Sequence, residues 1–147
     1  MDWKYRSNDC ESVSLHDCDI TEWRFEEGEL SLIFEYGFDI CAENHLNGTG
    51  RHKRMGEAAV VLKNAEFLSA EYPEYTVGDK LMPAEKIGLN EVLLLEFEVF
   101  GFGYENGVFS MECCVHHSRK LYCCVDFSCA ELLFCWIELA NDAWFQR

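Results

Sequence analysis

Five cysteines and two histidines fall within nineteen residues in the stretch Met111–Cys129. Thiolate and imidazole are the ligands that zinc prefers in proteins, and a zinc site takes three or four such groups. Because successive side chains of a β-strand point to opposite faces, a hairpin in this stretch gathers alternate cysteines and a histidine on one face. The preceding strand adds two glutamates to that face. The candidate zinc ligands are therefore Cys114, His116, Cys124, Glu96 and Glu98.

The spacing of these cysteines favours a second interpretation. Zinc ribbons use Cys-x-x-Cys knuckles, whereas the cysteines here are adjacent, so neighbouring thiols point to opposite faces. A three-residue loop at Ser118–Lys120 pairs Val115 with Cys123 and makes one face of the hairpin wholly apolar. The same register places Cys113 opposite Val125. We therefore favour Cys113 and Cys123 as small core residues, beneath an outer face that is partly polar and binds no metal.

A second constellation lies near the start of the chain. A strand through this region puts His16 and Cys18 on one face, and an antiparallel partner strand places Asp39 opposite His16. A cysteine, a histidine and an aspartate in contact are the components of a thiol nucleophile with its base. No helix N-terminus is available to stabilise a thiolate, so we favour a structural His–Asp hydrogen bond. The alternative is a metal patch, and its ligands would be His16, Cys18, Asp39 and Cys41.

A basic loop follows, bracketed by glycines, over residues 48–56. Backbone N–H groups and arginine side chains in such a loop can bind an anion or a partner. The loop lacks the Gly-x-x-x-x-Gly-Lys-Ser/Thr spacing of a P-loop. The favoured alternative is a solvated loop whose charges relieve a very acidic surface. The candidate binding residues are Arg51, His52, Lys53 and Arg54.

The elements that position these groups are mostly strands, because apolar side chains alternate along much of the chain. Glu27-Gly28 predicts a hairpin turn that places Phe25 opposite Leu30. Farther along this pair of strands, Leu15 is expected opposite Ile40. Over residues 92–104 the alternation changes phase, which predicts a β-bulge near Phe100-Gly101. Asn106-Gly107 predicts a type I′ turn into a strand over residues 108–117.

Three further segments complete the prediction. Residues 58–68 form another strand, and residues 71–90 form a connection with a short helical turn after Pro83. Residues 129–140 begin with a helix-capping pattern but are rich in strand-forming side chains, so we expect a strand. The sequence therefore predicts a single all-β domain over residues 1–147. It is an antiparallel β-sandwich or partly closed β-barrel of about seven strands with little helix.

Charge and cysteine usage narrow the classes of function. Twelve basic and 27 acidic residues give a net charge of −15, which disfavours binding to nucleic acid and to anionic membranes and suits a basic protein partner. No export signal and no transmembrane helix are recognisable. Nine cysteines without an export signal predict free thiols in a reducing compartment, and hence a cytoplasmic protein. The many aromatic residues form either a dense core or an apolar pocket.

Two short stretches carry a resemblance to known sequences. Ser14-Leu-His-Asp-Cys18 and the segment from Trp136 to Phe145 resemble a family of small bacterial proteins from gut Firmicutes-type genomes. That resemblance implies no activity. In size, acidity and all-β character the chain is also similar to the immunity proteins of bacterial toxin systems, as a class rather than by motif.

These observations lead to three functional hypotheses. The first is a non-enzymatic, acidic, soluble module that binds a basic protein, of which a toxin-neutralising immunity protein is one example. The second is a β-barrel that binds zinc or a small ligand through one of the Cys/His patches. The third is a thiol enzyme that uses Cys18 and His16. We expect no cofactor under the first hypothesis, and the oligomeric state is left open.

Overall fold

The computed structural model describes residues 2–116 and 122–146, and it confirms an all-β protein. Strand accounts for 57% of the chain and helix for 6%, so sheets provide nearly all of the framework. Within the described residues the strands form open antiparallel sheets and no closed barrel, which supports the sandwich alternative. The long strands expected from the sequence are divided by turns and bends into seventeen shorter segments in this part of the chain.

The first sheet has five strands and contains the hairpin predicted at Glu27-Gly28. Phe25 lies opposite Leu30 and Trp23 opposite Leu32, as expected, and both turn residues have positive φ. The segment after residue 129 forms a strand of this sheet, which confirms strand over helix. In spatial order the strands are β1 (Tyr5–Ser7), β16 (Glu131–Trp136), β8 (Ala58–Lys63), β5 (Glu29–Phe34) and β4 (Glu22–Glu26).

The second sheet has six strands and confirms the predicted bulge and turn. The pairing register shifts between Val99 and Gly101, and Asn106-Gly107 turns the chain with positive φ at both residues. The strand begins at Phe97 rather than at residue 92, because Val92 ends the short helix α1 (Leu89–Val92) and a turn follows it. In spatial order the strands are β12 (Glu85–Ile87), β9 (Glu66–Tyr72), β15 (Cys123–Ser128), β14 (Val108–Val115), β13 (Phe97–Glu105) and β3 (Cys18–Ile20).

The register predicted for the late hairpin is wrong by two residues. Cys113 lies opposite Cys123, and Met111 lies opposite Val125. A shift of two residues keeps every side chain on its predicted face, so Cys113 and Cys123 are both buried in the core as expected. The predicted loop at Ser118–Lys120 lies outside the described residues.

A third sheet continues the first sheet beyond a sharp break. Its order is β17 (Leu139–Asp142), β7 (Lys53–Met55), β6 (Asp39–Ile40) and β2 (Val13–Ser14). Three strands of the first sheet are continued along the chain by strands of the third sheet: β16 by β17, β8 by β7, and β5 by β6. These strands have the same neighbours in both sheets, so three adjacent strands are interrupted side by side. Backbone hydrogen bonds cross the break from Met55 N–H to the Phe38 carbonyl and from Gly56 N–H to the Glu138 carbonyl.

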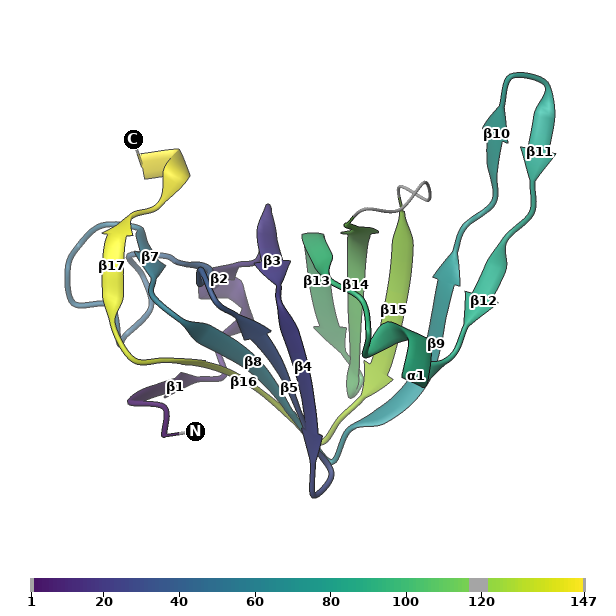
Figure 1. The fold of residues 1–147 in the computed structure, drawn as a ribbon. Helices are drawn as coiled ribbons and strands as arrows, with labels where there is room; N and C mark the ends of the chain where they lie inside the picture. The colour runs from purple at the N-terminus through teal and green to yellow at the C-terminus, as the bar shows by residue number, and fades with distance from the viewer. Residues whose placement is uncertain (1, 117–121, 147) are drawn as a thin grey trace.

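Residues 71–90 are more structured than the sequence indicates. They contain the hairpin of β10 (Tyr75–Val77) and β11 (Lys80–Met82), followed by β12. The short helix α1 begins at Leu89 rather than after Pro83. Figure 1 shows this hairpin projecting away from the two main sheets. Short 3-10 turns, η1 (Cys10–Ser12) and η2 (Trp144–Gln146), complete the described elements.

The main core lies between the first and second sheets, which face each other and meet at the end where the turns β4–β5 and β8–β9 lie (Figure 1). Aromatic side chains from both sheets fill it, including Phe34, Phe97, Phe127 and Trp136, all fully buried. This dense packing accounts for much of the aromatic content. No helix within the described residues is long and apolar enough to cross a membrane.

Candidate functional site

The late-hairpin patch is only partly assembled. Glu98 lies opposite Cys114, as predicted, and the His116 N–H donates to the backbone carbonyl of Glu96 at 3.0 Å. Cys124, however, lies opposite Glu112, because the hairpin register differs by two residues. The His116 ring lies against β3, with Nε2 2.9 Å from Asp19 Oδ1. In the described parts of the chain these candidate zinc ligands do not form a cluster of three or more ligand atoms within 4.8 Å of one another.

The N-terminal patch does not form a Cys-His-Asp array. The chain makes a tight turn at residues 15–17 with φ of 60° at Asp17, so it is not one continuous strand. Ser14 rather than His16 therefore lies opposite Asp39, and Val13 rather than Leu15 lies opposite Ile40. The His16 Nδ1–H donates to the Phe100 carbonyl at 2.9 Å, and its Nε2 lies 3.4 Å from the Asp17 carboxylate.

Asp39 instead pairs with Arg54, which the sequence assigned to the basic loop. Arg54 lies in β7 directly opposite Asp39, and its Nε is 3.1 Å from Asp39 Oδ1. The carboxylate of Asp39 is fully buried. The Arg54 guanidinium also donates to the Gly37 carbonyl at 2.9 Å and to Cys18 Sγ at 3.4 Å. Arg54 is therefore an internal link across the break between the first and third sheets.

The other basic-loop cations are also paired with a carboxylate. Arg51 donates through Nε and Nη2 to Asp142 Oδ2, and Lys53 Nζ lies 3.0 Å from Asp142 Oδ1. These hydrogen bonds lower the pKa of Asp142. The single negative charge of Asp142 in β17 therefore offsets one of the two positive charges of Arg51 and Lys53, which weakens the hypothesis of an anion-binding loop.

One group of possible metal ligands does come together among the described residues. Cys41, Glu43 and His52 offer ligand atoms within 4.8 Å of one another. However, His52 Nδ1 accepts the backbone N–H of Ala42 at 3.0 Å, so a neutral ring carries its proton on Nε2. Metal-binding histidines need one nitrogen with an open lone pair and usually donate the other N–H to an acceptor. Burial, followed by the charges of Glu43 and Asp39, raises the pKa of Cys41 and keeps its thiol protonated.

We expect four buried thiols to react slowly with iodoacetamide near neutral pH. Burial raises the pKa of Cys18 to about 12 and those of Cys123 and Cys135 to about 11, and it also raises the pKa of Cys113. The thiolate is the reactive form, so each of these thiols is almost wholly unreactive at pH 7. Mass spectrometry of timed alkylation in the native protein measures each rate. If Cys18 reacts faster than free cysteine, the thiol-enzyme hypothesis regains support.

The most distinctive polar site is a hollow of about 570 Å³ at the corner where β3 leads into β4. Among the described residues, its lining includes five carboxylates and one histidine but no lysine or arginine. Thr21 forms the corner, and its N–H donates to the Ile33 carbonyl at 2.9 Å. The hollow is called the acidic hollow below. Its charged or titratable lining residues are Asp19, Glu22, Glu35, Glu57, Glu96 and His116.

Sequence reasoning identified only part of this hollow. Glu96 and His116 were recognised as opposite each other, although as zinc ligands. Asp19, Glu22, Glu35 and Glu57 were missed because they come from separate segments of the chain that meet only through the corner and the sheet break. No local pattern marks them, since isolated acidic residues are common throughout this chain.

Comparisons of the chain with protein families, curated proteins and solved structures find no match. The function therefore has to be argued from the geometry and charge of the molecule. Two features of the acidic hollow bear on it. Five carboxylates line it, with no lysine or arginine among its described lining residues, and the exposed Tyr36 is one of the lining residues.

Proposed function

We propose that the protein is a non-enzymatic binding module that takes a basic protein partner through the acidic hollow. The observation that carries the proposal is the set of five carboxylates around one concave site. Glu22 already binds Arg24 and Asp19 lies 2.9 Å from His116, so the carboxylates left for a partner are Glu35, Glu57 and Glu96. An arginine or lysine side chain of the partner enters the hollow and exchanges its water shell for these carboxylates. Tyr36, 69% exposed, offers an aromatic face to the same cation.

The charge of the whole chain supports the same partner class. A net charge of −15 attracts a basic protein over a distance of about one Debye length and speeds productive encounters. It also opposes close approach of a second copy of this acidic chain. A toxin-neutralising immunity protein is one example of this proposed class. The absence of disulfides among the nine cysteines fits a reducing compartment such as the cytoplasm.

The test begins with affinity capture of a partner, followed by titrations with the purified partner protein. We expect the partner to be basic and its affinity to fall between about 50 mM and about 300 mM salt. The decisive variant changes Glu35, Glu57 and Glu96 to glutamine. We expect it to bind about tenfold more weakly, because each change removes a carboxylate without changing side-chain size.

A second triple variant controls for net charge. It changes Glu74, Asp79 and Glu105, which are exposed and lie outside the hollow, to glutamine or asparagine. Both variants carry a net charge of −12, since three acidic residues are removed from a chain of −15. We expect the control to lose less than about threefold in affinity. If the two variants lose equal affinity, the effect comes from long-range attraction alone, and the acidic hollow is not the binding site.

A further inference from the structure

The outer face of the first sheet contains a second hollow, of about 330 Å³, which adjoins the acidic hollow at Ile33. Beneath it lies a small apolar cluster, separate from the main core, of Ile33, Ala59, Val61 and Cys135. The half-buried Trp3 and Leu133 pack against this cluster. The four cluster residues are at most 3% exposed, so the apolar surface within reach of a ligand is that of Trp3 and Leu133.

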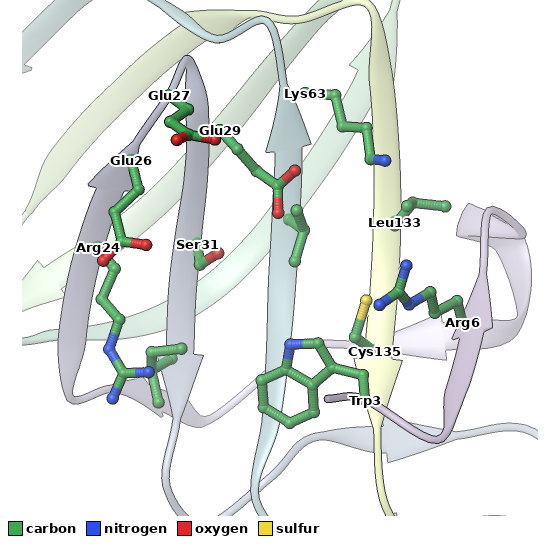
Figure 2. A pocket seen from close by; sticks show the side chains of 12 residues that line it. Trp3, Arg6, Arg24, Glu26, Glu27, Glu29, Ser31, Lys63, Leu133 and Cys135 are labelled. Carbon is green, nitrogen blue, oxygen red and sulfur yellow. The ribbon is translucent and has the colours of Figure 1, made fainter. Parts of the chain in front are cut away.

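The charges around this hollow are partly separated by sign, although Glu29 lies opposite Lys63 in the pairing of β5 with β8 and Arg24 lies beside Glu26. Figure 2 shows Glu26, Glu27 and Glu29 on the side of β4 and β5, and Lys63 and Arg6 on the side of β8, β16 and β1. In the described part of the chain no carboxylate oxygen lies within 4 Å of a charged nitrogen of Arg6 or Lys63. The third cation, Arg24, differs because it already binds Glu22 through two hydrogen bonds of 3.0 and 2.9 Å.

The charges of Arg6 and Lys63 affect the pKa of Cys135, which belongs to the apolar cluster. Burial raises the pKa of Cys135 to about 11, while the charges of Arg6 and Lys63 lower it and that of Glu29 raises it. Arg6 also lies directly opposite Cys135 in the pairing of β1 with β16. Both signs of charge therefore reach the apolar cluster, from opposite sides.

We propose that this outer hollow binds a small zwitterion with an apolar body, of the size of a tripeptide. The ligand's carboxylate meets Arg6 and Lys63, its ammonium meets Glu26 and Glu29, and its apolar side chains lie against Leu133 and Trp3. The separation of charge excludes ligands of one sign, because a polyanion meets the glutamates and a polycation meets the two basic residues. The volume lies at the lower end of the range for small-molecule sites.

The test uses trileucine and its blocked forms as probes, with binding followed by isothermal titration. N-acetylation removes the ammonium charge, and amidation removes the carboxylate charge. We expect saturable binding of trileucine, about tenfold weaker binding of each blocked form, and no saturable binding of triglycine, which lacks the apolar body. Absence of saturable trileucine binding, or equal affinity for free and blocked peptides, would overturn the proposal.

Paired variants assign each charge to its side of the hollow. In the Arg6→Gln, Lys63→Gln variant, trileucine and its amide should bind equally, while acetylation should still weaken binding. The Glu26→Gln, Glu29→Gln variant should show the reverse. The double variant Lys80→Gln, Lys86→Gln is the matched control, because it removes two positive charges that are exposed and lie outside the hollow, and we expect less than about a twofold change. If this control weakens trileucine binding as much as the Arg6→Gln, Lys63→Gln variant, the assignment of the carboxylate to Arg6 and Lys63 is wrong.

Discussion

Replacing Arg54 with alanine is expected to lower the free energy of unfolding by about 3–5 kcal/mol. Asp39 is fully buried, and Arg54 holds its carboxylate at 3.1 Å from the adjacent strand. Without the guanidinium, a buried negative charge would lose its cation, and the Gly37 carbonyl would lose a donor at 2.9 Å. An uncompensated buried charge is far more costly than a lost surface contact.

Urea titration of the purified variants measures this effect. Arg51→Ala is the matched control, because Arg51 pairs with Asp142 at 3.0 Å but its side chain is 51% exposed. We expect that change to cost less than about 1 kcal/mol. The double variant Asp39→Leu, Arg54→Met should be more stable than Arg54→Ala, since it removes both charges together. A loss from Arg54→Ala as small as that from Arg51→Ala would contradict the role given to the buried pair.

Replacing Gly37 with alanine is expected to lower the free energy of unfolding by about 2–5 kcal/mol. Gly37 has φ of +75°, a conformation that side-chain-bearing residues rarely adopt. A Cβ at this position would also approach the backbone carbonyl oxygen of Met55 to 2.3 Å and that of Gly56 to 2.5 Å. These carbonyls belong to the neighbouring strand at the sheet break, so the clash cannot be relieved by rotating a side chain.

The variant Gly28→Ala separates the cost of backbone strain from the cost of the steric clash. Gly28 has φ of +77°, nearly the same as Gly37, but an added Cβ would meet nothing within 4 Å. We expect Gly28→Ala to cost about 1–2 kcal/mol through backbone strain alone. Thermal or urea unfolding of both variants gives the comparison. If the two variants lose equal stability, the close approach of strands at the break has no energetic consequence.

Local signals in the sequence were sufficient where a turn and its two strands are neighbours in the chain. The hairpin at Glu27-Gly28 and the turn at Asn106-Gly107 follow from turn chemistry combined with alternation. The bulge near Gly101 follows from the change of phase. In the late hairpin, alternation fixed which face each side chain takes but not the register, because a shift of two residues leaves every face unchanged.

Features that depend on contacts between residues far apart in the chain could not be predicted from such local patterns. The turn at residues 15–17 has no glycine or proline to mark it, so the sequence gives a continuous strand there and a wrong partner for His16. The break between the first and third sheets requires three strands to bend together. Arg54 stabilises it by donating a hydrogen bond to the Gly37 carbonyl. The acidic hollow arises at that break and at the Thr21 corner, so its carboxylates could not be grouped beforehand.

The most direct test of the proposed function is to map the partner's contact surface by amide chemical shifts in the isotopically labelled protein. We expect the largest changes on adding the purified partner at residues 19–22, 35–36, 57, 96 and 116, which surround the acidic hollow. Changes concentrated instead on the β10–β11 hairpin, or around Arg6, Lys63 and Leu133 on the first sheet, would contradict the acidic hollow as the site of recognition.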